Sequence, residues 1–348
     1  MGIERKHQKW YNVFVKKTKE MSTLPDFEPK KLALLRILQI LEKYSDIDHP
    51  LGQKAIADIL DRDYGIELER KAVSRNISLL KEAGFEIEQL PEGVYLAERQ
   101  FEDSELRLLI DGVLSGRFIS AKHSADLIEK LCSLGNKYFR NHVKNIYSVR
   151  EWNKTDNVAV FYTIDIIDEA IEKGEQITFD FNRYGADKQL HRVAHHIVSP
   201  YQMVLKNQSY YLMAYNEKWK HIAYYRLDRI TEARIVDTPA TPLKSIDGYQ
   251  NGIDYKRFSS SLPYMFSDKP QRVEFVCDER MLDQAMDWFG KSIIITPYGE
   301  RYKVEVNVSL MAMEYWVLQY LSDVDILSPQ SLKEKIKSDL LEAIKKYE

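Results

Sequence analysis

The 348-residue chain lacks several features that would otherwise define its class. It contains only two cysteines, Cys132 and Cys277, far apart in the sequence, which argues against a disulfide framework and suits a reducing cytoplasm. No stretch comes near the roughly eighteen apolar residues of a membrane span, and the N-terminus has no apolar signal core. The net charge is only −3, so a nucleic-acid surface must be a local patch. A cytoplasmic protein without membrane contact is expected.

Recognisable catalytic signatures are also missing. The sequence has no glycine-rich phosphate loop, no serine-hydrolase elbow, no zinc-protease helix and no paired cysteine motif. Its carboxylates are plentiful, but no spacing singles out a pair. We therefore expect a protein that is not an enzyme and needs no cofactor. A nucleotide-acting enzyme built on arginine and histidine side chains is the less favoured alternative.

The composition is that of a soluble globular protein, with 44% hydrophobic and 30% charged residues. A chain of this length should form two or more domains with sizeable cores. The order of helix and strand patterns predicts a multi-domain α+β protein. The expected parts are an N-terminal extension (1–29), a winged helix-turn-helix (30–98), a helical connector (99–155), a β-barrel domain (156–240), a linker (241–270) and a ferredoxin-like domain (271–348).

Three helices followed by a hairpin are expected between residues 30 and 97. Apolar residues recur at helical spacing over 32–41, 56–60 and 73–80, with Gly84 as a C-cap of the third helix. Alternation around Pro91-Glu92-Gly93 then predicts a two-stranded wing. This order is typical of a winged helix-turn-helix. The link at 62–68 is longer than a tight helix-turn-helix turn.

The third helix is the candidate DNA-reading element. Between Arg70 and Lys81 there are four basic residues and no acidic one. A basic face that is merely solvated is the alternative, but these charges lie on the helix that the topology places in a major groove. Residues 1–29 mix basic and aromatic side chains, either as a solvated extension or as an arm on phosphates. The expected DNA-binding residues are Lys54, Arg70, Lys71, Ser74, Arg75, Asn76, Ser78 and Lys81.

The connector is expected to be helical throughout residues 100–150. One helix starts within Phe101–Leu106, with Asp103 or Ser104 as a plausible N-cap, and another runs from Ser120 to Leu134. This segment could also hold a dimer contact.

Residues 156–240 predict a helix over 158–173, strands over 176–181 and 192–199, and then an aromatic hairpin. The hairpin strands are Ser209–Tyr215 and Ile222–Leu227, joined by a polar turn at 216–218. One helix followed by four or five short strands fits a small, strongly bent β-barrel.

Arginines lie among the hairpin's aromatic residues. A guanidinium surrounded by rings indicates a site for an anion or a planar ring. The alternative is that the tyrosines form core and the arginines pair with Asp228 and Asp180. Arg226 and Arg229, three apart, would face opposite sides unless the strand bends between them.

Four of the eight histidines fall between residues 191 and 221. The spacing of His191, His195 and His196 raises the question of zinc, but it falls on a predicted strand with no cysteine nearby. Polar strand residues, one or two of them lining a pocket, are the favoured interpretation, and no metal is expected.

The hairpin also carries a resemblance. Ser199-Pro200, a short strand, the Lys206-Asn207 turn, Tyr210-Tyr211-Leu212 and Arg226-Leu227-Asp228-Arg229-Ile230 together resemble a WYL domain, with Tyr210 in place of the tryptophan. The resemblance implies an Sm-like barrel that senses a nucleotide or a short nucleic acid. The expected ligand-binding residues are Arg183, His196, Ser199, Tyr210, Tyr211, Tyr225, Arg226 and Arg229.

The last part of the chain predicts the order β-α-β-β-α-β-α between residues 272 and 347, which is typical of a ferredoxin-like domain. It resembles the extension that often follows WYL domains. Together the parts predict a ligand-responsive transcriptional regulator that binds double-stranded promoter DNA as a homodimer. A repressor is the first interpretation, because a dimer occupying a promoter needs no other surface. An activator of the same architecture is the rival.

Overall fold

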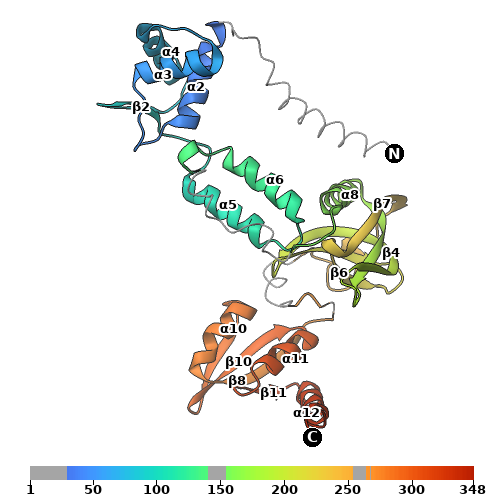
Figure 1. Cartoon of the computed structure of the whole chain (residues 1–348). Helices are drawn as coiled ribbons and strands as arrows, with labels where there is room; N and C mark the ends of the chain where they lie inside the picture. Colours follow the sequence, from blue (N-terminus) through green and yellow to red (C-terminus); the bar gives the residue numbers. More distant parts are fainter. Residues whose placement is uncertain (1–29, 140–153, 254–263, 267) are drawn as a thin grey trace. The chain divides into compact units, whose positions relative to one another are not determined.

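The computed structural model describes residues 30–139, 154–253, 264–266 and 268–348, and the predictions for residues 1–29 fall outside this part of the chain. The chain divides into two compact units (Figure 1). The first comprises residues 1–115 and 121–153, and the second comprises residues 116–120 and 154–348. The fold is mixed α+β, with helices and three antiparallel sheets among the described residues.

The first unit begins with three helices and a two-stranded hairpin, which fits a winged helix-turn-helix. Ile37, Ile56 and Val73, one from each helix, are fully buried in its core. The hairpin pairs Ile87 with Leu96 and closes at residues 91–92. These elements are η2 (Lys30–Leu32), α2 (Ala33–Tyr44), α3 (Gln53–Tyr64), α4 (Arg70–Glu82), β1 (Ile87–Leu90) and β2 (Gly93–Leu96).

Two connector helices complete the described part of this unit, α5 (Asp103–Ser115) and α6 (Ala121–Cys132). They bury Leu106, Ile110 and Cys132 against one another.

The predicted glycine ends α4: Gly84, with φ of 97°, follows the C-cap Ala83, and the N–H of Phe85 donates to the carbonyl of Leu80 at 3.1 Å. The predicted N-cap of α5 was wrong by about one residue. Asp103 and Ser104 lie inside the first turn of α5. The N–H of Glu102 donates instead to the carboxylate of Glu105 at 2.9 Å, so α5 starts earlier than expected.

The second unit contains a five-stranded sheet in the order β6-β5-β4-β3-β7. Helix α8 ends at Gly174, which has φ of 65°, and buries Ile167 and Ala170 against the strands. The elements are α8 (Val160–Lys173), β3 (Glu175–Tyr184), β4 (Leu190–Lys206), β5 (Ser209–Asn216), β6 (His221–Arg226), η4 (Leu227–Arg229) and β7 (Ile230–Pro239).

Register shifts bend this sheet. One lies between Phe181 and Asn182, and another between Pro200 and Gln202. They let β4, seventeen residues long, pair with β3 along its first part and with β5 along its second.

The chain after β7 packs back on the same sheet. Within the predicted linker, η5 (Leu243–Ser245) and the residues after it place Ile246 and Tyr249 against Met213 and Ile222.

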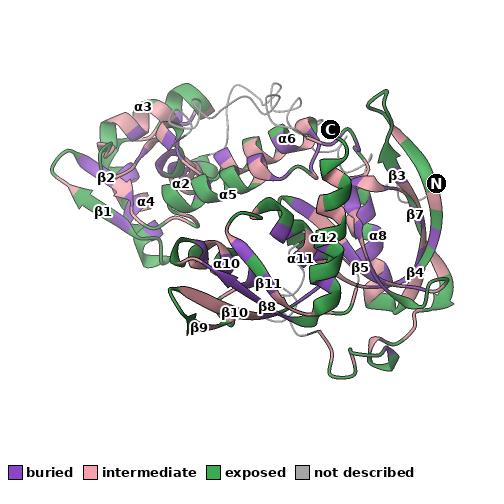
Figure 2. Ribbon diagram, turned by 90° about the horizontal axis from the view of Figure 1, so that it is seen from below, coloured by how far each residue is buried: buried purple, intermediate pink, exposed green. Residues whose placement is uncertain are grey.

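A four-stranded sheet in the order β11-β8-β10-β9 forms the last part of the chain. Phe275, Phe289 and Trp316 are buried between this sheet and its helices. In each unit the buried residues lie where helices and strands pack together (Figure 2). No helix among the described residues is long and apolar enough to cross a bilayer. The elements are β8 (Gln271–Cys277), η6 (Glu279–Met281), α10 (Leu282–Phe289), β9 (Ile294–Tyr298), β10 (Arg301–Val308), α11 (Leu310–Gln319), β11 (Val324–Ser328) and α12 (Gln330–Ile344).

Candidate nucleic-acid and ligand sites

Helix α4 has one buried face and one exposed basic face. Val73 and Ile77 point into the core of the winged helix. Lys71, Arg75 and Ser78 are exposed and follow one another at intervals of three or four residues, so they share the opposite face. This face can offer two cations and a hydroxyl to phosphates or base edges.

The other residues predicted to bind DNA have mixed positions. Arg70 and Lys81 are exposed at the two ends of α4, and Lys54 is exposed on α3. Asn76 is half-buried, and its amide donates to the carbonyl of Ala72 at 2.8 Å. This hydrogen bond and its position away from the exposed face make Asn76 the weakest candidate.

Hydroxyls in α4 are also engaged within the helix. The hydroxyl of Ser78 donates to the carbonyl of Ser74 at 3.2 Å, and Ser74 itself is half-buried. Ser78 retains lone pairs toward the exterior. Two residues that the sequence did not single out, Leu79 and Glu82, lie beside Arg75 at helical spacing and are exposed. Helical spacing from Arg75 could have identified both residues, but the prediction considered only basic and polar residues up to Lys81.

The first candidate ligand site is an arginine cluster formed by Tyr184, Tyr211, Arg226, Asp228 and Arg229. Arg226 forms a bidentate pair with the Asp228 carboxylate, at 3.0 Å from Nε and 2.8 Å from Nη2. Nε of Arg229 lies 3.6 Å from the same carboxylate. The turn of η4 after β6 brings both arginines to Asp228. The chain therefore bends between Arg226 and Arg229, which is the condition under which both side chains can face the same site.

Charge in this cluster is not balanced. Two guanidinium groups share one carboxylate, and Asp228 is only 3% exposed. Burial opposes the charge of Arg226, but hydrogen bonds and the charge of Asp228, helped by Tyr211 and Tyr184, raise the pKa of Arg226. Two guanidinium groups against one carboxylate leave one positive charge over.

Arg229 has an unused donor. Its side chain is 17% exposed, its Cζ lies 4.0 Å from the centre of the Tyr184 ring, and its buried Nη1 has no hydrogen-bond partner among the described residues. A buried donor without an acceptor costs about 1–3 kcal/mol, and more when it is charged. An anionic or carbonyl-bearing ligand would supply that acceptor.

The second cluster surrounds His196, which is 8% exposed. Its ring lies 5.0 Å from that of Tyr225 and 5.2 Å from that of Trp219. The amide of Asn216 donates to the Tyr225 hydroxyl at 2.7 Å and lies 3.4 Å from Nδ1 of His196. Burial, with the nearby charges of His195 and Lys218, lowers the pKa of His196. The ring is therefore a neutral part of the sheet's interior.

Ser199 is fully buried, and its hydrogen bonds are used within the protein. Its hydroxyl donates to the Glu217 carboxylate at 2.7 Å and accepts the Thr241 N–H at 2.9 Å. The Thr241 hydroxyl donates to the same carboxylate at 2.8 Å. These hydrogen bonds connect the chain after β7 to β4, so Ser199 has a structural role.

The remaining predicted ligand residues are spread over the sheet. Tyr211 lies opposite Arg226 in the pairing of β5 with β6 and belongs to the arginine cluster. Tyr210 is half-buried, with its ring 5.2 Å from that of Phe118. Arg183 is exposed near the end of β3, opposite His191. Of the eight predicted residues, the structure thus brings Tyr211, Arg226 and Arg229 together in the arginine cluster, and His196 and Tyr225 together in the second cluster.

Two histidines on β4 are held by carboxylates. His191 lies 2.7 Å from Asp187, and His195 lies 2.7 Å from both Asp180 and Thr178. Across the described residues, no three histidine, cysteine or acidic side chains are grouped as metal ligands. The alternative in which the arginines pair with Asp228 and Asp180 is correct for Asp228, which contacts both Arg226 and Arg229. It is wrong for Asp180, which pairs with Arg192 at 3.3 Å.

Comparison with known proteins identifies this part of the chain. Residues 162–235 match the WYL domain family. The chain contains a WYL domain. The match runs from α8 into β7, so it includes both the arginine cluster and the cluster around His196. Tyr184 and Asp228, which the sequence had not named as ligand residues, lie inside the same WYL domain.

No curated protein matches the chain significantly. Among solved structures it is similar to proteasome accessory factor B/C (PafBC) of Arthrobacter aurescens, with 17% identity, TM-score 0.29, and coverage of 88% of this chain and 47% of that one. The chain thus spans about half of PafBC. It is also similar to a CRISPR Cas-related protein, with 16% identity, TM-score 0.37, and coverage of 97% and 91%.

Proposed function

We propose that this protein is a DNA-binding transcriptional regulator whose WYL domain binds a nucleotide or a short single-stranded nucleic acid. The unused Nη1 donor of Arg229, beside an excess positive charge and the Tyr184 ring, carries the ligand part of this proposal. Phosphate oxygens satisfy a guanidinium, and a base can stack on an aromatic ring. Both chemistries meet in the arginine cluster.

The DNA part of the proposal rests on α4. Its exposed face carries Lys71 and Arg75, and the helix contains no acidic residue before Glu82 at its last position. The wing formed by β1 and β2 follows it in the chain, as in winged helix-turn-helix proteins. The protein as a whole is slightly acidic, so this local patch is where duplex DNA would be held.

The finer parts of the architecture belong to the same proposal. A helix followed by five antiparallel strands, with β3 and β4 strongly bent, supports an Sm-like barrel. The order β11-β8-β10-β9 supports a ferredoxin-like C-terminal domain. We propose a homodimer on a two-fold related promoter site, with repression as the first interpretation and activation as the rival. A binding role is favoured over catalysis because His196, the histidine predicted to line the ligand site, is enclosed by the rings of Trp219 and Tyr225.

The test separates the two sites by mutation. Arg229→Ala and Arg226→Ala should weaken binding of a 5′-phosphorylated thymidylate pentamer by about tenfold or more, because each removes charged hydrogen-bond donors. Neither should change the affinity for a duplex selected by the protein from a random pool. Arg234→Ala is the matched control, since Arg234 lies on β7, is exposed and pairs only weakly with exposed Glu232.

Arg75→Ala is the reciprocal variant. It should weaken duplex binding and reduce its salt dependence, while pentamer binding stays unchanged. Duplex binding that survives in Arg75→Ala and in Lys71→Ala would remove α4 as the reading helix. Pentamer binding that is unaffected in both Arg226→Ala and Arg229→Ala would remove the arginine cluster as the ligand site.

A further inference from the structure

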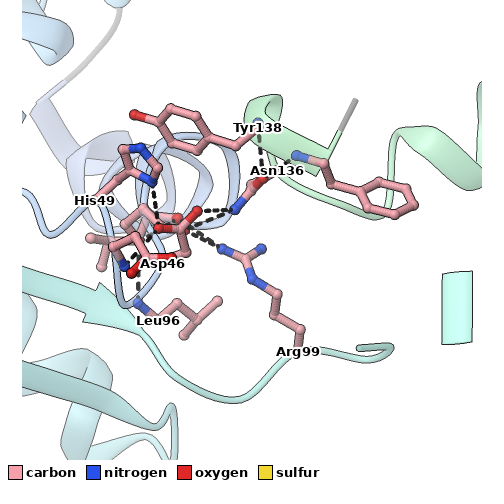
Figure 3. Close-up of polar contacts among 10 residues, drawn as sticks. Asp46, His49, Leu96, Arg99, Asn136 and Tyr138 are labelled. Carbon is pink, nitrogen blue, oxygen red and sulfur yellow. Dashed lines mark hydrogen bonds and ion pairs between the residues drawn. The ribbon is translucent and has the colours of Figure 1, made fainter. Parts of the chain in front are cut away.

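The C-terminal end of α2 is bound by an arginine from the chain after the wing (Figure 3). Nη1 of Arg99 donates to the carbonyl of Glu42 at 2.7 Å, and Nη2 donates to the carbonyl of Ser45 at 2.6 Å. The carbonyl of Leu41 lies 3.5 Å from Nη2. The last carbonyls of a helix have no partner within it, and a cation there also meets the negative end of the helix dipole. Arg99 therefore caps the C-terminal end of α2.

An asparagine after α6 reaches the same place. Asn136 is 4% exposed, and its amide donates to the Asp46 carboxylate at 2.8 Å. Its carbonyl oxygen accepts the N–H groups of Tyr138, at 2.9 Å, and of Phe139, at 2.8 Å. Asp46 in turn lies 2.7 Å from Nδ1 of His49, whose ring stacks on Tyr138 at 3.5 Å between centroids (Figure 3).

The wing joins this group through Ser45, which is fully buried. Its hydroxyl donates to the carbonyl of Leu41 at 2.7 Å and accepts the N–H of Leu96, in β2, at 3.2 Å. Ser45, Asp46, Arg99 and Asn136 thus form one α2-end cluster that joins α2, β2 and the connector. Ser45 and Asn136 are buried while Asp46 and Arg99 are half-buried, and the hydrogen bonds of such a network strengthen one another.

The turn between α5 and α6 belongs to the other unit. Residues 116–120, here the tip segment, group with the WYL domain although the helices on both sides do not. The N–H of Arg117 donates to the carbonyl of Gln208 at 3.1 Å, and the carbonyl of Arg117 accepts the N–H of Thr155 at 3.0 Å. Phe118 packs on Tyr210, with ring centres 5.2 Å apart.

The residues that contact the tip segment, Gln208 and Tyr210, are close in the chain to Tyr211 of the arginine cluster. Gln208 lies in the turn between β4 and β5, where both central residues have positive φ. Tyr210 follows in β5, and the next residue, Tyr211, lies opposite Arg226. A ligand that displaces Tyr211 or Arg226 would move the strand whose turn holds the tip segment.

We propose that the winged helix and the connector helices α5 and α6 move as one body, and that the effector signal enters this body through the tip segment. The hinges are then the Ser115–Gly116 and Ser120–Ala121 junctions, and Arg99 and Asn136 are positioning residues that transmit the movement to α4. This inference rests on the proposed function only for the identity of the signal.

The rigid body can be tested without ligand or DNA by amide hydrogen exchange on the full chain. The amides of Leu96, Tyr138 and Phe139 report on the α2-end cluster, and those of Ile77 and Leu80 report on the core of α4. In the wild type the protection factors of all five amides, which are the factors by which their exchange is slower than in the unfolded chain, should agree within about threefold, because one cooperative unit opens at once. Protection factors of the cluster amides more than about tenfold smaller than those of α4 would overturn the one-body claim.

The coupling is tested with the 5′-phosphorylated thymidylate pentamer. Its binding should change exchange at Arg117 and Thr155 and leave Leu96, Tyr138 and Phe139 unchanged. In the wild type the pentamer should change the affinity for the duplex, and in Arg99→Ala this change should be at least about fivefold smaller. The affinity of Arg99→Ala for the pentamer itself should stay within about twofold of the wild-type value. Arg107→Ala is the control, since Arg107 is half-exposed on α5 and pairs with Asp111.

The outcomes separate the two proposals. A wild type that does not bind the pentamer contradicts the proposed function, and the exchange rates of the free protein still decide the one-body claim. A pentamer that binds and changes duplex affinity equally in wild type and Arg99→Ala overturns the coupling inference. Should Arg99→Ala be unfolded, Arg99→Lys, which keeps the charge but loses the guanidinium fork, replaces it and must show the same loss.

Discussion

Arg99 in the first unit and Arg229 in the second are both held by polar groups, but their donors are used differently. The two terminal nitrogens of Arg99 meet three carbonyls at the end of α2. Arg229 shares a carboxylate with Arg226, lies against Tyr184, and leaves Nη1 without an acceptor.

This difference separates a structural cluster from a candidate binding site. A group whose donors are all satisfied gains nothing from a ligand, whereas a buried unused donor is stabilised when a ligand supplies an acceptor. The α2-end cluster should therefore contribute stability, and the arginine cluster should contribute affinity. Each of the following variants breaks or sharpens this comparison.

Asp228→Ala should have the largest effect on stability. It leaves two partly buried guanidinium groups without their carboxylate, so we expect a loss of about 3–5 kcal/mol in the free energy of unfolding of the second unit. Urea unfolding followed by the fluorescence of Trp219 and Trp316 would measure it. Asp237→Ala, an exposed position on β7, is the control. A loss below about 1 kcal/mol would mean that the arginines do not depend on Asp228.

Asn136→Ala should destabilise the first unit by about 1–3 kcal/mol, because it removes one hydrogen bond to the Asp46 carboxylate and leaves two backbone N–H groups without their acceptor. Circular dichroism during urea unfolding would show a lower midpoint. Lys137→Ala changes the neighbouring exposed residue and should cost under about 1 kcal/mol, because its contacts with the Tyr44 and Tyr138 rings are at the surface. Equal losses in both variants would contradict the role given to Asn136.

Arg229→Met tests the comparison in the opposite direction. The variant removes an unsatisfied donor and keeps an apolar stem against Tyr184, so the free energy of unfolding should change by less than about 1 kcal/mol. Binding of the phosphorylated pentamer should nevertheless fall about tenfold or more. Calorimetric titration and thermal unfolding of the same sample would show both. A large loss of stability would make Arg229 a structural residue like Arg99.

Much of this organisation can be predicted from the sequence because it depends on local patterns. The helical spacing of apolar residues predicted α2, α3 and α4, and alternation predicted the hairpin of β1 and β2. Aromatic and apolar runs on both sides of a polar turn predicted the hairpin of β5 and β6. The order of elements from β8 to α12 also agrees with the prediction. In all these cases neighbouring residues determine the element.

Features that depend on distant residues were not predicted. Strand β4 is longer than the predicted 192–199 because it continues past Pro200 by shifting register against β5. Asn136 meets Asp46 across ninety residues, and a single polar residue gives no signal of such a contact. The meeting of Arg226 and Arg229 at Asp228 depends on η4, which strand spacing alone could not indicate. Arginines among aromatic residues and the WYL resemblance indicated this site, whereas periodicity gave no signal of it.

His196 gives the smallest expected effect and a direction that can be tested. Burial lowers the pKa of this ring in the folded protein, so the unfolded chain binds a proton more readily. Stability therefore rises with pH where the unfolded state carries the extra proton. The contribution of the neutral His196 ring to stability should be fully present above the ordinary histidine pKa of about 6.5. It should be lost progressively as the pH falls toward the lowered pKa of His196 in the folded protein.

The corresponding variant is His196→Gln, which keeps a polar group beside Asn216 but cannot titrate. The difference in free energy of unfolding between pH 7 and pH 5 should become smaller in this variant than in the wild type, as measured by urea unfolding at both values. His221→Gln, at an exposed position on β6, should leave that difference unchanged. An identical pH dependence in wild type and His196→Gln would show that the ring is protonated without cost inside the WYL domain. In that case the cluster around His196 would accept positive charge, and it, as well as the arginine cluster, would have to be tested for a ligand.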